Sequence, residues 1–127
     1  MKKKNLSKET ITKMREVIAA VLAEPKFYDQ NFYPHPCKTS CCAAGYAVRI
    51  NDPKSYEAKV KDTKFNWRVA AEDVLGLNTD GGYKLFLFAS DWPIQFARDY
   101  SDANSALGRA QAMAARWEHF IKTDGKD

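Results

Sequence analysis

The clearest pattern of apolar and polar positions lies near the start of the chain. Apolar residues recur there at spacings of three and four, at Ile11, Met14, Val17, Ile18, Val21 and Leu22. This period places them on one face of a helix, which indicates a buried stripe. Ser7 is a suitable N-cap, Glu9 lies in the first turn, and Pro25 ends the segment. The pattern predicts a helix from about residue 8 to residue 24.

The same period recurs further along the chain and predicts an all-α protein. Helices are expected at about 41–50, 66–75, 83–88, 92–100 and 105–122. The polar segment 53–64 reads as surface with at most one short turn, and the Asn-Thr-Asp-Gly-Gly run at 78–82 reads as a break. We therefore expect a single compact domain of five or six helices spanning 1–127, with frayed ends at 1–6 and 123–127.

Residues 25–40 connect the first two helices and carry four aromatic side chains, Phe27, Tyr28, Phe32 and Tyr33. A connector of this length inside a small domain is usually either packed on the domain or functional. The aromatic residues therefore predict either a lid over the core or a surface that binds a partner, because exposed Tyr and Phe are common interface anchors.

The length and charge of the chain limit the classes of protein to which it can belong. A chain of 127 residues with 45% apolar composition is long enough to bury a core as one domain. No apolar run is long enough to cross a membrane, and no apolar signal core follows the basic start, so we expect a cytoplasmic protein. Residues 1–64 carry 13 Lys and Arg against 7 Asp and Glu, a net of +6, whereas residues 65–127 carry 7 against 9, a net of −2.

Four of the five cysteines and histidines lie within eight residues, at His35, Cys37, Cys41 and Cys42. Zinc prefers tetrahedral nitrogen and sulfur ligands, and the best set here is His35, Cys37, Cys42 and the distant His119. We expect no cofactor, with zinc as the alternative. The other readings are buried free thiols, a reactive thiol at Cys41 or Cys42, and a Cys37–Cys42 disulfide.

Two further features suggest binding to charged molecules. Lys38, Thr39 and Ser40 precede a predicted helix and could hold an anion, although an ordinary N-cap also explains the two hydroxyls. Basic residues gather at 2–8 and again at 54–68, which is the basis for nucleic-acid binding as an alternative function. The adjacent carboxylates of Glu72 and Asp73 are expected on a solvated helix surface.

Several short motifs occur in a recognisable order between residues 37 and 121. They are the Cys37–Cys42 segment followed by Ala-Gly-Tyr-Ala at 44–47, Leu-Gly-Leu at 75–77, Leu-Phe at 85–86, Trp-Pro at 92–93, and Arg-Trp-Glu-His-Phe-Ile at 116–121. This order resembles a family of small bacterial and phage helical proteins of unknown function, with Cys37 and Cys42 as the matching cysteine pair. The resemblance implies a helical fold and a cysteine loop, and it carries no established activity.

Since these residues form no catalytic constellation, the sequence favours a non-enzymatic accessory or regulatory protein that binds a protein partner. Inhibition of a host or defence protein by a phage-encoded chain is one concrete hypothesis. The predicted binding surface consists of Phe27, Tyr28, Phe32, Tyr33 and Lys38. A nucleic-acid-binding protein and a zinc- or thiol-dependent protein are the alternatives.

Overall fold

The structure is a computed structural model that describes residues 5–30, 42–62, 64–86 and 88–127. Within these ranges it contains seven α-helices, two 3₁₀ turns and no strand of a sheet. They are α1 (Lys8–Ala23), η1 (Pro25–Phe27), α2 (Ala43–Asn51), α3 (Pro53–Lys59), α4 (Trp67–Leu75), α5 (Thr79–Phe86), η2 (Ala89–Asp91), α6 (Ile94–Asp102) and α7 (Ala106–Lys122). The predicted all-α class is confirmed, but the helices are more numerous than the five or six expected.

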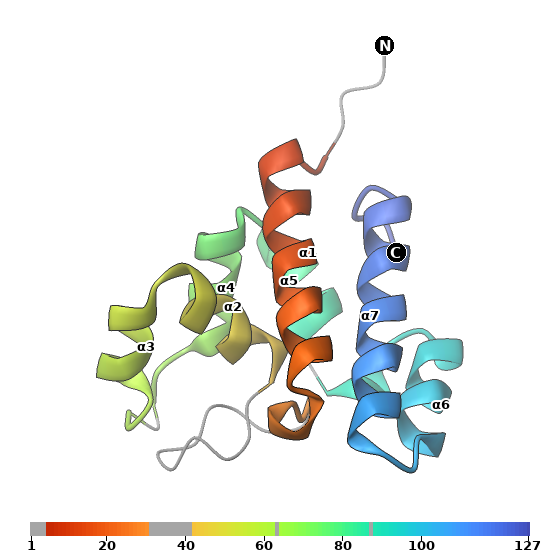
Figure 1. The fold of residues 1–127 in the computed structure, drawn as a ribbon. Coiled ribbons are helices and arrows are strands. Elements are labelled where there is room, and N and C mark those ends of the chain that lie inside the picture. The colour runs from red at the N-terminus through yellow and green to blue at the C-terminus, as the bar shows by residue number, and fades with distance from the viewer. Residues whose placement is uncertain (1–4, 31–41, 63, 87) are drawn as a thin grey trace.

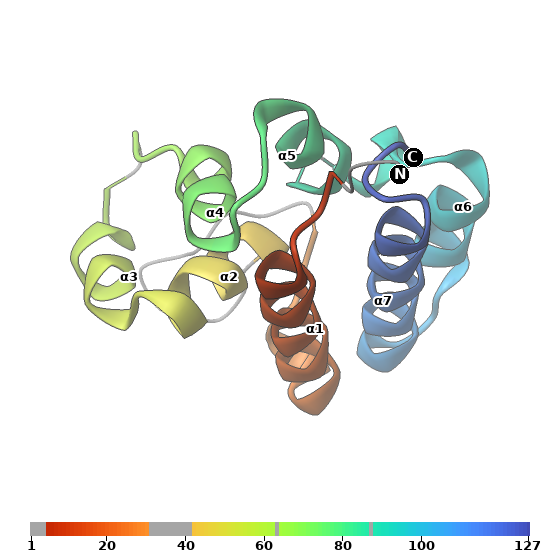
Figure 2. The ribbon, with the colours of Figure 1, turned by 90° about the horizontal axis from the view of Figure 1, so that it is seen from above.

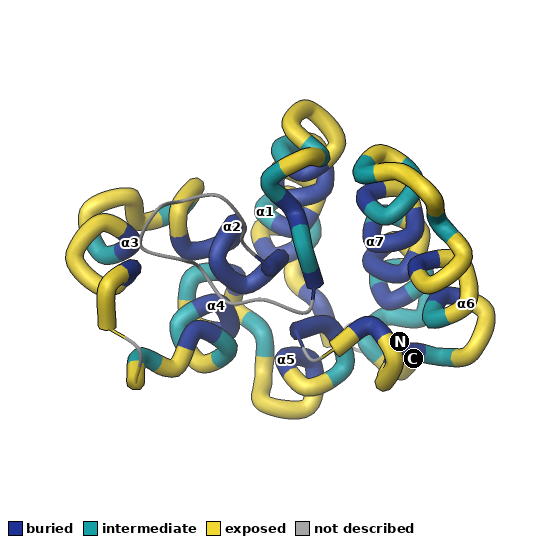
Figure 3. The backbone as a smooth tube through the Cα atoms, turned by 90° about the horizontal axis from the view of Figure 1, so that it is seen from below, coloured by how far each residue is buried: buried dark blue, intermediate teal, exposed yellow. Residues whose placement is uncertain are grey.

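The first helix lies in the middle of the molecule. Helices α2 and α4 pack on one side of α1 and α7 packs on its other side (Figures 1 and 2). Helix α3 extends the first side next to α2, and α6 covers the outer side of α7 (Figure 2). The buried parts of α1, α2 and α7 face one another across this arrangement (Figure 3). The core therefore runs through the molecule from α4 to α7.

Helix α1 forms as its sequence predicts. The Ser7 hydroxyl accepts a hydrogen bond from the backbone N–H of Thr10 at 3.0 Å, which satisfies one of the free donors at the helix start. Met14, Val17 and Val21 are completely buried. The helix ends at Ala23, two residues before Pro25.

Helix α3 occupies a segment that was expected to be a polar surface stretch. The Asp52 carboxylate accepts from the backbone N–H of Ser55 at 3.2 Å, and Pro53 stands at the first helical position, where a missing N–H costs nothing. Tyr56 is buried against Trp67, with 5.6 Å between the ring centroids. One buried aromatic and a good cap are thus enough to form this short helix, and the expectation of a mere surface turn was wrong.

Helix α5 begins inside the predicted break at 78–82. The Asn78 side chain accepts from the backbone N–H of Gly81 at 2.7 Å, so the run starts a helix instead of ending one. Gly81 and Gly82 are buried, and the Glu72 side chain lies directly against Gly82. The two glycines permit close packing of α5 on α4, which explains why the predicted break was wrong.

Glu72 was expected to lie on a solvated helix surface, but its side chain is only 7% exposed. Its carboxylate forms an ion pair with the guanidinium of Arg68, one helical turn earlier. That guanidinium also lies 4.1 Å from the ring centroid of Tyr83 on α5. The carboxylate is therefore buried together with its counterion, as buried charges usually are.

Two predicted helix starts are shifted in the structure. The N-cap of α2 is Cys42, whereas Thr39 and Ser40, the predicted caps, lie outside the described residues. The helix expected from residue 92 begins at Ile94, because Asp91 belongs to η2 and Pro93 is the N-cap of α6. The intervening bend allows Trp92 to turn into the core.

The two ends of the described chain contact each other, where frayed segments were expected. The Asp124 carboxylate accepts from the backbone N–H groups of Asn5 at 2.7 Å and Leu6 at 2.9 Å. The Lys84 ammonium donates to the backbone oxygens of Gly125 and Lys126, at 3.2 and 2.8 Å. These contacts join α1, α5 and the end of α7.

Candidate partner-binding groove

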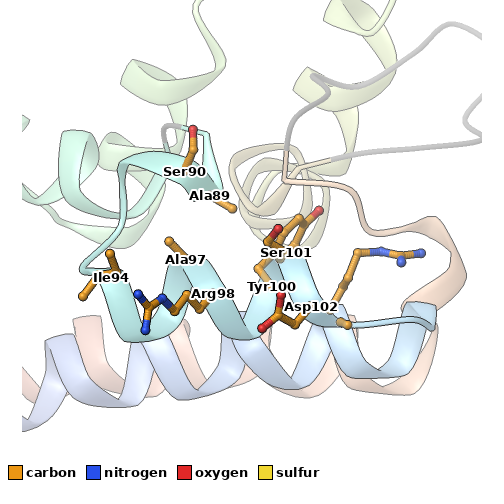
Figure 4. Close-up of a pocket in the computed structure, with 10 residues that line it drawn as sticks. Ala89, Ser90, Ile94, Ala97, Arg98, Tyr100, Ser101 and Asp102 are labelled. Atoms are coloured by element: carbon orange, nitrogen blue, oxygen red, sulfur yellow. The ribbon is translucent and has the colours of Figure 1, made fainter.

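A groove of about 500 Å³ lies between η2 and α6 and reaches the start of α7. Figure 4 shows Ala89 and Ser90 of η2 on one side of it and the side chains of α6 on the other, with the Ser90 hydroxyl pointing away from α6. Ten residues line the groove: Ala89, Ser90, Ile94, Ala97, Arg98, Tyr100, Ser101, Asp102, Ala103 and Arg109. It therefore combines a largely apolar wall with two guanidinium groups, one carboxylate and three hydroxyls.

The groove arises because α6 has two faces with different roles. Phe96 and Tyr100, four residues apart, are buried on the face that packs into the domain. Ile94, Ala97 and Ser101 share the other face, which borders the groove (Figure 4). Ile94 is 68% exposed, the highest value among the large apolar residues that the structure describes as exposed.

Tyr100 forms the inner wall of the groove and is held in place by several groups. Its hydroxyl accepts from the backbone N–H of Gln30 at 2.9 Å and donates to Asp29 Oδ1 at 3.3 Å. The Trp92 ring packs edge-on against it with 5.8 Å between centroids. Burial raises the pKa of Tyr100 to about 12, so the hydroxyl remains protonated at neutral pH. This wall of the groove is thus fixed before any partner binds.

The two guanidinium groups at the groove have no partner among the described residues. Arg98 and Arg109 make no hydrogen bond or ion pair with any other residue in the part of the chain described. Asp102 lies one helical turn after Arg98, but its carboxylate and the Arg98 guanidinium do not form an ion pair, for which they would have to lie within 4.0 Å. By contrast, the guanidinium of Arg15 is already bound to Glu118 by two hydrogen bonds of 3.1 Å each.

The structure describes only part of the predicted aromatic surface. Tyr28 is 3% exposed, and its hydroxyl donates to Gln30 Oε1 at 2.7 Å, so its side chain belongs to the core. Phe27 is partly buried against the same core. Phe32, Tyr33 and Lys38 lie outside the described residues. The burial of Tyr28 agrees with the interpretation of this aromatic residue as part of a lid over the core. A binding role for Phe27, Phe32, Tyr33 and Lys38 stays a prediction.

Of the predicted metal ligands, the structure describes Cys42 and His119, whereas His35 and Cys37 lie outside the described ranges. Cys42 is buried at the start of α2, and His119 lies on α7, with α1 between these two helices (Figures 1 and 2). His119 Nε2 is 2.8 Å from Asp127 Oδ2, and its ring packs against Phe96 at 5.2 Å. Among the described residues, no three or more His, Cys, Asp or Glu side chains form a group that could hold a metal ion.

Cys42 has the properties of a buried structural thiol. It is 1% exposed, and burial raises its pKa to about 11, although the neighbouring N–H groups of Ala44 and Gly45 act in the opposite direction. A thiol is nucleophilic only as its thiolate, so Cys42 is unreactive at neutral pH. The burial of Cys42 therefore gives no support to a reactive thiol at this position. Cys41, the other candidate, lies outside the described residues.

The basic segment 54–68 is mostly solvated. Lys54, Lys59, Lys61 and Lys64 are exposed, and the Lys59 ammonium lies 5.9 Å from the centroid of the Phe65 ring. Arg68 is occupied by Glu72 and Tyr83, so it is not free to bind a phosphate.

The groove was not found from the sequence. The sequence predicts a short helix over about 92–100, and nothing in its pattern distinguishes Arg98 or Arg109 from other exposed arginines. The available signal was the spacing of residues 94, 97 and 101, which places them on a different face from residues 96 and 100.

No helix among the described residues is both long enough and apolar enough to span a membrane. Comparison of the chain with protein-family models, with curated proteins and with solved structures finds no match. The resemblance to small phage and bacterial helical proteins stays a prediction.

Proposed function

We propose that this protein is a small non-enzymatic helical protein that acts by binding a protein partner through the groove between η2 and α6. The observation that carries the proposal is the position of Ile94, a large apolar side chain exposed at the rim of a groove with further apolar walls. Single exposed apolar residues are common on protein surfaces. An exposed apolar anchor beside a preformed groove and free guanidinium groups is typical of an interface, where apolar and Arg side chains supply most of the binding energy.

This proposal moves the binding surface away from the aromatic connector. Tyr28 is buried and is bound to Gln30, so it supports the fold directly, and its replacement would disturb the core together with any interface. Ile94 is a better probe, because its side chain is exposed and a polar replacement leaves the core intact. An accessory or regulatory role, including inhibition of a host or defence protein by a phage-encoded chain, is the hypothesis that this surface serves.

The proposal is tested by quantitative capture of partners with matched variants. The bait proteins are the wild type, Ile94→Glu at the groove and Val69→Glu on α4, where Val69 is a 43% exposed apolar residue that does not line the groove. We expect proteins retained by the wild type and by Val69→Glu to be lost with Ile94→Glu. The proposal fails if every retained protein binds Ile94→Glu as well as it binds the wild type.

Nucleic-acid binding is a second candidate, supported by the exposed Lys54, Lys61 and Lys64 near α3. Asp52, Glu57 and Asp62 interrupt this segment, which weakens its field. Affinity for DNA or RNA that falls steeply with salt, and falls further on replacing these lysines, would favour this function over the groove. A zinc- or thiol-dependent function rests on His35 and Cys37, outside the described residues, and the burial of Cys42 lends it no support.

A further inference from the structure

We infer that the groove between η2 and α6 binds an acidic protein segment that inserts an apolar side chain beside Ile94. This inference rests on the proposed function and specifies the chemistry of the partner. Its basis is the combination, in one groove, of an apolar wall with two guanidinium groups that lack partners among the described residues.

The apolar part of the groove has the right size for side chains. Ala89 and Ala97 are small residues that leave space between η2 and α6, and Ile94 borders this space (Figure 4). A volume of about 500 Å³ accommodates a few side chains of a docked segment and is too large for one methyl group. Burying an apolar side chain there removes apolar surface from water, which favours binding.

The charged side chains of the groove determine which sign of charge a partner must carry. Arg98 and Arg109 line it with a single carboxylate, Asp102, so the lining carries a net charge of +1. Asp91 and Asp99 lie on the same two elements, but they do not line the groove. A guanidinium presents a planar set of donors that matches a carboxylate in a bidentate arrangement. An acidic side chain is therefore the complement of Arg98 and Arg109.

Three other arginines of the protein differ from these two, while Arg49 lies 5.9 Å from the centroid of the Tyr56 ring. Arg15 is bound to Glu118, and Arg68 is bound to Glu72 and stacked on Tyr83. Arg116 is buried and donates to backbone oxygens of Asp127 and Lys84. Each of these three has its partner within the chain, whereas Arg98 and Arg109 have no hydrogen-bond partner among the residues that the structure describes.

The hydroxyl of Ser101 adds a donor at the same groove, and Tyr100 gives it a fixed wall. A rigid wall lowers the entropy that binding must remove, which favours recognition of a short segment. The expected segment has an apolar residue in the centre, which packs beside Ile94, and Asp or Glu residues on both flanks.

The test uses isotope-labelled full-length protein and three synthetic peptides that share a Leu-Phe centre. The first has Glu flanks, the second has Lys flanks and the third has Ser flanks. We expect the Glu peptide to shift the amide resonances of Ile94, Ala97 and Ser101 and the methyl resonances of Ile94 and Ala97. It should bind at least tenfold more tightly than the Lys peptide. Replacing Arg98 and Arg109 together by Glu should reverse this preference, while the paired control Arg15→Glu should leave it unchanged.

The outcomes separate this inference from the proposed function. Equal binding of the three peptides in the groove, or a preference that survives the double replacement, overturns the acidic segment and leaves a partner-binding groove. Absence of groove shifts with every peptide also overturns the inference. If, in addition, Ile94→Glu retains every partner of the wild type, the proposed function fails with it.

Discussion

The Glu72 carboxylate occupies the space that a side chain at position 82 would need, because a Cβ on Gly82 would fall 1.7 Å from Glu72 Oε2. The backbone of α5 approaches α4 closely only because position 82 is glycine. The same carboxylate is paired with Arg68, one turn earlier on α4. Gly82 on α5 therefore leaves the room that this buried ion pair occupies.

The first prediction follows from this contact. Gly82→Ala gains about 1 kcal/mol in helix propensity but must displace a buried carboxylate, for a net loss of about 1–3 kcal/mol in the free energy of unfolding. Urea denaturation measures the loss. In a Glu72→Ala background the obstacle is absent, and Gly82→Ala should then be neutral or stabilising. Equal losses in both backgrounds would show that the Glu72 contact is not the cause.

Removal of the Tyr100 hydroxyl tests the rigid wall of the groove. Tyr100→Phe deletes the hydrogen bonds with Gln30 and Asp29 while it keeps the ring packed on Trp92. We expect the free energy of unfolding to fall by about 1–2 kcal/mol. Tyr83 is half exposed and its hydroxyl has no hydrogen bond among the described residues, so Tyr83→Phe is the matched control and should change stability little. Similar effects of the two variants would contradict the assignment.

Stability should fall at alkaline pH. Burial raises the pKa of Cys42 from 9.0 to about 11 and that of Tyr100 from 10.0 to about 12, and it raises the pKa of Tyr28 well above its ordinary value. The unfolded chain therefore loses these protons at lower pH than the folded chain does. The stability that these groups contribute is complete below about pH 9 and is lost as pH rises toward 12.

The urea midpoint, followed from neutral pH to pH 12, measures this loss. Tyr100→Phe should flatten the decline in the range between about 10 and 12, where the hydroxyl ionises in the unfolded chain but not in the folded one. A midpoint that stays constant or rises over this range would contradict the burial of these groups.

The contact between the two ends of the described chain is tested by Asp124→Asn, which removes the charge and keeps a residue type that tolerates the positive φ of 55° at this position. We expect faster hydrogen exchange at Asn5 and Leu6, whose N–H groups bind the carboxylate. Asp73→Asn, at an exposed carboxylate on α4, is the control. Unchanged exchange in Asp124→Asn would support the frayed ends that the sequence predicts.

The sequence predicted the long and strongly periodic elements of the fold. Helix α1 was found because its apolar stripe is uninterrupted and Ser7 caps it, and α4 because Asn66 begins it and Gly76, with φ of +78°, ends it. Helix α3 was missed because one buried residue, Tyr56, gives no period. The start of helix α5 was missed because glycine usually interrupts a helix, and the reason for glycine at position 82 lies on another helix.

The groove was beyond the reach of the sequence for a related reason. The period of residues 94–102 predicts a helix but does not say which of its two faces packs on the domain. That choice depends on Trp92 and Tyr100, which pack together and turn the opposite face, with Ile94, outward. Likewise, the sequence cannot tell Arg98 and Arg109 from Arg15 and Arg68, because their pairing is a property of the folded chain.

The most direct measurement for the central claim is the affinity of a captured partner for the wild type, Ile94→Ala and Val69→Ala, determined by calorimetry. An apolar anchor at an interface contributes about 1–2 kcal/mol or more when truncated. We therefore expect binding weaker by about fivefold or more for Ile94→Ala and unchanged binding for Val69→Ala, at equal stability of the two variants. Equal affinities for all three proteins would show that the groove between η2 and α6 is not the binding surface.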